Sequence, residues 1–369
     1  MQTRMKMFWQ RYGLAIIVLF GLWNEAHAQA AERYAQAIAT SREAVRAMMQ
    51  SSKAPGVSVA VARNGEIVWN EAFGFADLKQ KVRATTETRF GLGSVSKSFT
   101  GVLAARLMEE GLIDLDAPVE KYLPQFPHKN MSARLIIAHL SGLNDEYNSA
   151  HYYDTRSLTT AVALQEILAT NTLQYPPRTS FAYTTSNYTI VAAIVEHTSG
   201  VDFPTVMAQY VFEPLELQHT SFNDPTSRPE QTAKFYVKNF FRVTEAPAYD
   251  PSFKLAGAGL LSTAADVARL GAALLRDGFL KPSTRAEIFR GLKTSAGEET
   301  NYALGWYIEK DDNSRRIYQH GGGGPGMAAH VRLYPQENSV IAILSNLTGA
   351  PVDGKVAEKV SAAFLDLSQ

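Results

Sequence analysis

Apolar runs with the character of strands gather near both ends of the chain. Two of them, Val57–Ala62 and Glu66–Phe73, flank the pair Asn64-Gly65. Asn-Gly between apolar runs is a strong hairpin signal, because both residues tolerate positive φ. Four more strands are predicted near the carboxyl end, at 303–309, 315–319, 328–334 and 340–345. Strands joined by tight turns favour an antiparallel sheet.

Helical patterns fill most of the remaining sequence. An alanine-rich amphipathic helix is predicted over 30–49, and another from Ser94 to Glu110, where Gly111 ends it. The middle of the chain, from Leu112 to about Lys254, consists mainly of helical patterns joined by loops rich in Pro and Gly. A capping box, Thr263-x-x-Asp266, begins a helix over 264–276. A last helix is expected at about 352–367.

These elements together predict the α+β fold class. We expect an antiparallel sheet built from both chain ends and flanked by the terminal helices. A mainly helical region is inserted at about 112–254. A chain of 369 residues suits roughly two domains, or one large domain with an insertion. We therefore expect one domain over 29–369 that contains a sheet part and a helical part.

The composition excludes several classes of function. Basic and acidic residues number 36 each, so no global charge attracts nucleic acid or an anionic membrane. The chain has no cysteine, which excludes thiol catalysis, disulfides and iron–sulfur clusters. No His-x-x-x-His pair occurs among the histidines, so we expect neither a metal nor a cofactor.

The first 28 residues have the pattern of a signal peptide. Arg4, Lys6 and Arg11 precede an apolar run from Leu14 to Trp23, which is short for a bilayer span. Ala26-His27-Ala28 follows and has the small-x-small pattern of a cleavage site. We expect cleavage after Ala28 and an exported protein, periplasmic or secreted, without a stable membrane span. An uncleaved anchor is the alternative.

Ser94 and Lys97 form the first candidate for catalytic chemistry. They lie three residues apart at the start of a predicted helix, so they share one helix face. The partial positive charge and free N–H groups of a helix amino end stabilise an alkoxide. A serine hydroxyl becomes a nucleophile when a nearby base takes its proton, and a lysine with a lowered pKa can do so. The alternative is an ordinary N-cap serine followed by a surface lysine.

Two further segments carry candidate site residues. Tyr183 could exchange a proton with a neighbouring lysine, although a buried structural tyrosine is the alternative. The run His320-Gly321-Gly322-Gly323-Gly324 could let a substrate backbone lie close to a strand. Gly323 N–H could then pair with Ser94 N–H to hold an oxyanion. A turn or bulge is the alternative for this run. The aromatic pairs at 235–236 and 240–241 are expected to pack in the helical region or in a loop over the site.

The order and spacing of these motifs resemble those of the serine β-lactamase-like hydrolases, which include class C β-lactamases, D-alanyl-D-alanine carboxypeptidases and esterases. The resemblance extends from about Pro55 to Asn346 and includes His139-Leu140-Ser141-Gly142. It implies that Ser94 is the nucleophile and that Lys97 and Tyr183 are the base and proton relay. It also implies a substrate site lined by Thr185, His320, Gly321, Gly322 and Gly323.

Two positions depart from the family pattern. Thr185 stands where the family usually has asparagine, with Asn187 two residues further on. His320 stands where a dedicated β-lactamase usually has lysine. Both departures resemble the mitochondrial serine β-lactamase-like branch, which implies peptidase activity. We therefore expect an exported serine peptidase or esterase that acts on a small-molecule, ester or peptide substrate. A β-lactamase or D-alanyl-D-alanine carboxypeptidase is one alternative, and a filament-forming scaffold is another. The sequence leaves the oligomeric state open.

Overall fold

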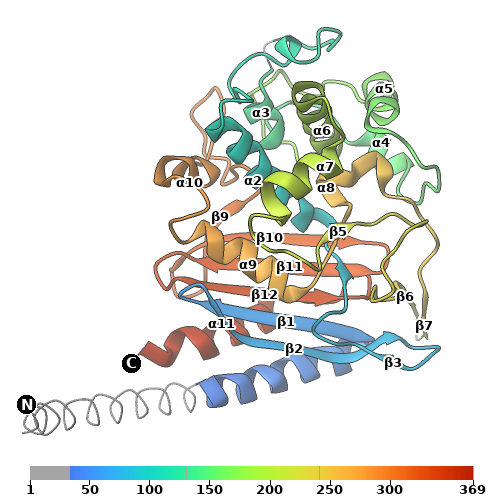
Figure 1. Ribbon diagram of the computed structural model, residues 1–369, viewed down its shortest axis with the longest axis vertical. Helices are drawn as coiled ribbons and strands as arrows, with labels where there is room; N and C mark the ends of the chain where they lie inside the picture. Colours follow the sequence, from blue (N-terminus) through green and yellow to red (C-terminus); the bar gives the residue numbers. More distant parts are fainter. Residues whose placement is uncertain (1–33, 130, 241, 369) are drawn as a thin grey trace, which may run out of the picture.

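The computed structural model describes residues 34–129, 131–240 and 242–368. The predicted signal peptide over 1–28 lies outside these residues. In the described part of the chain the main sheet has seven strands, all paired antiparallel (Figure 1). Their spatial order is β3 (Val82–Arg83), β2 (Glu66–Asp77), β1 (Gly56–Arg63), β12 (Ser339–Ser345), β11 (Met327–Tyr334), β10 (Arg316–Gly324) and β9 (Tyr307–Lys310).

The pairing of β1 with β12 joins the two ends of the chain, with Val57 opposite Ser345 and Arg63 opposite Ser339. The predicted hairpin between β1 and β2 is present, and Asn64 and Gly65 both have positive φ, at 50° and 85°. The predicted α+β fold with a sheet made from both chain ends is therefore confirmed.

Both faces of this sheet are covered by helices, and this explains why its central strands are continuously apolar. Val59 and Val61 of β1 pack in the cluster that includes the helix over 34–52 and α11 (Gly354–Leu365). Ala60 and Ala62, which point to the opposite face, pack in the cluster that includes α9 (Ala264–Leu274). The Thr263 side chain accepts a hydrogen bond from Asp266 N at 3.2 Å, which confirms Thr263 as the N-cap of the predicted capping box. The Asp266 carboxylate instead accepts from His219 N at 2.8 Å and from Arg269 at 2.7 Å.

The chain between β4 (Phe90–Gly91) and β8 (Leu260–Ser262) forms most of the upper part of the molecule in Figure 1. Its helices are α2 (Ser96–Glu109), α3 (Ala133–Ile137), α4 (Glu146–Ala150), α5 (Thr160–Thr170), α6 (Ser186–Ser199), α7 (Phe203–Met207) and α8 (Leu255–Ala258). Short strands also occur there, namely β5 (Ser221–Phe222), β6 (Tyr236–Asn239) and β7 (Arg242–Glu245). This region also contains two short helical turns, η1 (Gly93–Val95) and η4 (Ser252–Lys254). A further helix, α10 (Pro282–Ile288), follows α9.

Three local predictions differ from the structure. The strand predicted at 303–309 begins only at Tyr307, because the chain turns at Gly305, where φ is 80° and the backbone lies against Lys97 O. The strand predicted at 315–319 continues to Gly324, so the glycine run is part of β10 and the alternative of a turn is wrong. Phe235 and Tyr236 are buried, but Phe240 at the β6–β7 turn is 95% exposed, so the packing expected for it is wrong. Phe241 lies outside the described residues.

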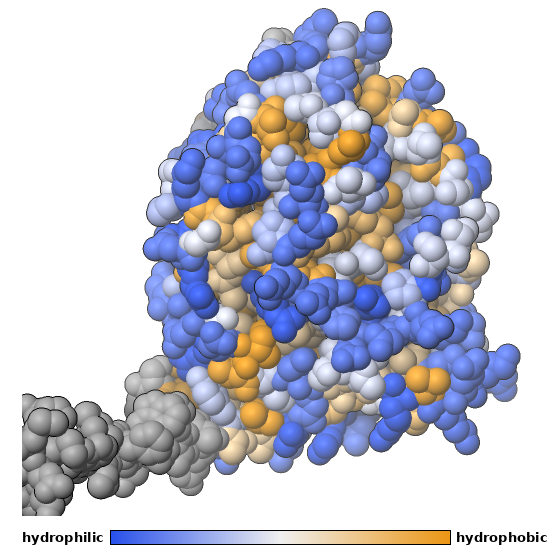
Figure 2. Space-filling view, viewed as in Figure 1, coloured by the Kyte–Doolittle hydropathy of each residue, from blue (hydrophilic) through white to orange (hydrophobic). Residues whose placement is uncertain are grey.

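The surface facing the viewer in Figure 2 is mostly hydrophilic, with separate hydrophobic spots over the helical region and near the amino-terminal helix. Scattered apolar positions of this kind are ordinary on a globular protein. Within the described residues, none of the helices combines the length and the apolar character needed to cross a membrane.

Candidate active site

Ser94 lies in η1, directly between β4 and α2. The turn before it depends on Gly93, whose φ of 49° suits glycine and whose backbone lies against Gly323. α2 begins at Ser96, so Lys97 lies in its first turn, one turn after Ser94. Lys97 Nζ lies 3.1 Å from Ser94 Oγ, within hydrogen-bond distance. The structure therefore brings together the two residues that the sequence spacing paired.

Lys97 is fully buried at the centre of a hydrogen-bonded cluster. Besides Ser94, its Nζ donates to Thr185 Oγ1 at 3.2 Å and to the Gly257 carbonyl at 3.0 Å. Burial lowers the pKa of Lys97 to about 7, while the carboxylate of Asp145 acts in the opposite direction. A neutral amine retains two N–H groups for Thr185 and Gly257, and its lone pair then faces the Ser94 hydroxyl. This arrangement suits an amine that accepts the Ser94 proton.

Tyr183 lies beside the same two groups. Its ring centre is 4.9 Å from Lys97 Nζ, and its side chain hydrogen-bonds Ser94. Burial raises the pKa of Tyr183, so the phenol is protonated at neutral pH. A protonated phenol next to the serine can donate a proton or relay one, while Lys97 is the group whose pKa suits a base.

Thr185 and Asn187 have separate places in the structure. Thr185 contacts Lys97, as described above. Asn187 is buried away from this contact, where Ser141 Oγ donates to its Oδ1 at 3.0 Å and its Nδ2 donates to the Ile136 carbonyl at 2.9 Å. Asn187 therefore holds the loop after α3 in place and does not lie where Thr185 does.

The glycine run forms one open edge of the site. β9 pairs with β10 from Arg316 to Gln319, and the described pairing stops there. Gly322 packs so closely against η1 that a Cβ on it would lie 1.9 Å from Leu92 O. A Cβ on Gly323 would meet no atom within 4 Å. The backbone of Gly323 therefore lies beside the serine turn and borders open space, which an extended substrate chain could occupy.

His320 points into the protein interior. It is 2% exposed, and its Nε2 is 3.0 Å from Tyr302 Oη while its Nδ1 is 2.6 Å from the Gly321 carbonyl. Burial, reinforced by the charge of Lys97, lowers the pKa of His320 to about 3. A neutral ring with its proton on Nδ1 satisfies both hydrogen bonds. His320 therefore brings no positive charge to the site.

His139 supports the tyrosine, a role that sequence reasoning did not assign. It is fully buried with φ of 59°, and its Nδ1 accepts a hydrogen bond from Thr184 N at 3.1 Å. Its carbonyl accepts one from Ala182 N at 2.9 Å, and its ring centre is 4.3 Å from that of Tyr183. The His-Leu-Ser-Gly motif was visible in the sequence, but its contact with the 182–184 segment was not.

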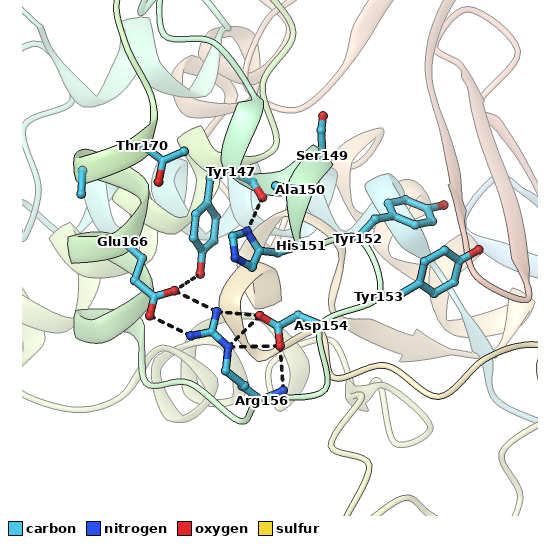
Figure 3. Close-up of a pocket in the computed structure, with 11 residues that line it drawn as sticks. Tyr147, Ser149, Ala150, His151, Tyr152, Tyr153, Asp154, Arg156, Glu166 and Thr170 are labelled. Atoms are coloured by element: carbon cyan, nitrogen blue, oxygen red, sulfur yellow. Dashed lines mark hydrogen bonds and ion pairs between the residues drawn. The ribbon is translucent and has the colours of Figure 1, made fainter.

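A cavity of about 670 Å³ lies beside α4 and the loop after it (Figure 3). Its charged residues are bonded to one another, since Arg156 contacts both Asp154 and Glu166. Ser94, Lys97 and Tyr183 do not line it. We therefore place the candidate active site at Ser94 and not in this cavity.

The fold and these contacts define a serine hydrolase of the β-lactamase and penicillin-binding class. The beta-lactamase family model matches residues 42–365, and the chain belongs to this family. The human mitochondrial serine beta-lactamase-like protein LACTB is 26% identical over 400 residues, which cover 82% of this chain and 73% of the human protein.

Solved structures share the fold. The D-amino acid amidase from Ochrobactrum anthropi has a TM-score of 0.77 and 20% identity, and the match covers 88% of this chain and 99% of the amidase. The hydrolase EstCE1, which has promiscuous acyltransferase activity, has a TM-score of 0.75 and 22% identity, with 92% and 99% of the two chains covered. This chain therefore shares its fold with an amidase and with a hydrolase.

Proposed function

We propose that the protein hydrolyses esters or peptides through an acyl-enzyme on Ser94. The observation that carries this proposal is the 3.1 Å contact between Ser94 Oγ and Lys97 Nζ, in a setting that lowers the pKa of Lys97 to about 7. At neutral pH a large fraction of Lys97 is then a free amine, which can take the Ser94 proton as Oγ attacks the substrate carbonyl.

The later steps use the same groups. As the tetrahedral intermediate collapses, the bond from the carbonyl carbon to the leaving group breaks, and the proton held by Lys97 passes to the leaving group through Tyr183. Water then attacks the acyl-enzyme, gives a proton back through the same groups, and releases the acid and free Ser94. The close approach of Gly93 to Gly323 supports an oxyanion hole made of Ser94 N–H and Gly323 N–H.

The substrate preference follows from the open strand edge and from the neutral histidine. The unpaired side of Gly321 to Gly323 can receive an extended acyl or peptide chain. A β-lactam carries a carboxylate next to its reactive ring, and neutral His320 offers it no charge. A charge-assisted hydrogen bond is worth about 1.5–3 kcal/mol, or roughly one to two powers of ten in kcat/KM. We therefore place esters and peptides ahead of β-lactams.

Two other assignments remain proposals. The pattern of residues 1–28 supports export with removal of this segment, and residues 29–369 then form the hydrolase domain. A scaffold or filament role is the second candidate from another class of function. The buried and shifted Lys97 beside Ser94 favours the enzyme, because a scaffold has no need of a lysine that burial destabilises.

The test is a substrate panel. Purified protein is assayed with p-nitrophenyl acetate, a peptide ending in D-alanine and nitrocefin, each beside the Ser94→Ala variant. We expect turnover of the ester or the peptide, lost in Ser94→Ala, and nitrocefin turnover far below that of a dedicated β-lactamase. Efficient nitrocefin turnover that does not change between pH 6 and pH 8 would refute the substrate preference. Absence of any Ser94-dependent turnover would favour the scaffold.

A further inference from the structure

A second buried lysine, Lys254, lies behind the catalytic cluster, and the reaction described above does not use it. It ends η4, three residues before the Gly257 carbonyl to which Lys97 donates. Lys254 is 5% exposed, and its Nζ donates to Asn148 Oδ1 at 3.3 Å. The same Nζ lies 5.0 Å from the ring centre of Tyr152, a wall residue of the cavity in Figure 3. Burying an ammonium with so few partners is costly, so its presence calls for a reason.

Asp145 connects this lysine to the active site. The Asn148 amide bridges the two, since its Oδ1 accepts from Lys254 and its Nδ2 donates to Asp145 Oδ2 at 3.0 Å. The other carboxylate oxygen, Asp145 Oδ1, accepts from the N–H and the hydroxyl of Ser186 at 3.1 and 2.9 Å. Ser186 directly follows Thr185, the residue that accepts a hydrogen bond from Lys97. A continuous chain of contacts therefore runs from Lys254 through Asp145 to Lys97.

The carboxylates of the adjoining cavity are engaged with an arginine. Asp154 and Glu166, on the cavity side of Tyr152, are both bonded to Arg156 (Figure 3). In the part of the chain that the structure describes, neither Lys254 nor Lys97 forms an ion pair within 4.0 Å. Asp145 is the acid whose charge acts on both lysines.

The remaining titratable groups that face Lys97 are uncharged at neutral pH. Burial raises the pKa of Tyr183 and of Tyr188 on α6, so both phenols keep their protons. Burial lowers the pKa of His139 and of His320, so both rings are neutral. The charges that act on Lys97 are therefore those of Asp145 and Lys254.

We propose that Lys254 and Asp145 are a pair of opposed positioning residues for Lys97, Lys254 favouring the neutral amine that accepts the Ser94 proton and Asp145 favouring the ammonium that forms next. This rests on the proposed function. Burial lowers the pKa of Lys254 itself to about 8, so most copies carry the charge at pH 7 and below, where Lys97 gains its proton. His320 on β10 is neutral. The second positive charge near Lys97 is therefore that of Lys254 on η4.

The experiment measures kcat/KM for p-nitrophenyl acetate between pH 5 and pH 9. In the wild type we expect activity to rise through the pKa of Lys97 and then level off. Lys254→Met should move this rise to higher pH by about one unit, the order expected for a unit charge at ~10 Å and an effective dielectric of ~20. Activity at pH 6 should then fall about tenfold, with the plateau unchanged. Asp145→Asn should move the rise to lower pH.

The controls separate charge from packing. Lys254→Arg keeps the charge and should keep the wild-type profile, and Lys79→Met removes an exposed, distant lysine and should change nothing. Thermal melting shows which variants fold. If Lys254→Met does not fold, Asp145→Asn still tests whether these charges set the pKa of Lys97. The proposal is overturned if the pH profile of kcat/KM does not move in folded Lys254→Met and Asp145→Asn. It is also overturned if the profile moves in the same direction in these two variants. A wild type without Ser94-dependent turnover overturns the proposed function instead.

Discussion

At the scale of single residues, the proposed chemistry depends on one lysine, Lys97, whose pKa lies near neutral pH. Lys97 has no carboxylate in direct contact among the described residues, and burial is the main reason that its pKa falls to about 7. Three fixed partners, Ser94 Oγ, Thr185 Oγ1 and the Gly257 carbonyl, hold its Nζ in place. Such fixed geometry lets the proton move without reorganisation of the site.

The lowered pKa of Lys97 predicts how activity depends on pH. In the proposed mechanism the neutral amine is the active form, so kcat/KM should increase with pH through about 7 and be lost as the amine gains a proton below that value. Lys97→Met should lower kcat by more than the ~10²-fold of a typical general base, since it also removes the partner of the serine. Stopped-flow acylation rates over the pH range provide the measurement. A rate that is flat from pH 5 to pH 8 would contradict this role.

Some of these residues could be predicted from the sequence and others could not. The Ser94–Lys97 pair depends on helix spacing, which is local and therefore visible in the chain. Contacts between elements that are far apart in sequence determine the positions of His139, Gly257 and Lys254. No local sequence pattern therefore predicts them. The interior position of His320 also depends on its hydrogen bond with Tyr302. No sequence motif links these two residues.

At the scale of elements, β10 and η1 lie on two sides of the candidate active site. The fold was predictable because its strands and helices have strong local patterns, such as the Asn64-Gly65 turn and the Thr263 cap. The end of β10 was not, because four consecutive glycines are typical of a turn and become a strand here only by packing against η1 and β11. Tertiary contacts decided the conformation of this segment.

Two neighbouring glycines of β10 allow a matched test. Gly323→Ala places a methyl group in open space at the proposed substrate edge, so we expect a normal melting temperature and a clear fall in kcat/KM. Gly322→Ala drives a methyl group into Leu92 O, so we expect a loss of stability on the order of 1–3 kcal/mol. Differential scanning calorimetry and ester kinetics on both variants separate the two effects. Equal behaviour of the two variants would contradict the assigned substrate edge.

At the scale of the whole molecule, the chain ends build the sheet and the long central segment supplies most of the site. Ser94 and Lys97 come from the start of this segment, Tyr183 and Thr185 from its middle, and Gly257 from its end. β10 then closes the site from the sheet. The composition excludes cysteine chemistry, but it cannot show how these segments come together. Their assembly depends on the pairing of β1 with β12, two strands that lie far apart in the sequence.

The amino-terminal segment gives a prediction about processing. We expect the protein to be exported from a bacterial host and cleaved after Ala28, because charged, apolar and small residues follow one another in the order that signal peptidase requires. Amino-terminal sequencing of the exported protein should begin at Gln29. Cytosolic protein that still begins at Met1 would refute this assignment.

The covalent intermediate on Ser94 is the central claim, and intact-mass spectrometry tests it most directly. The protein is incubated with a fluorophosphonate or a slowly hydrolysed ester, and its mass is compared with that of Ser94→Ala treated in the same way. We predict one adduct per chain, located by peptide mapping at Ser94, and no adduct on the folded Ser94→Ala variant. An adduct of equal yield on Ser94→Ala, or one mapped to a different residue, would contradict the account.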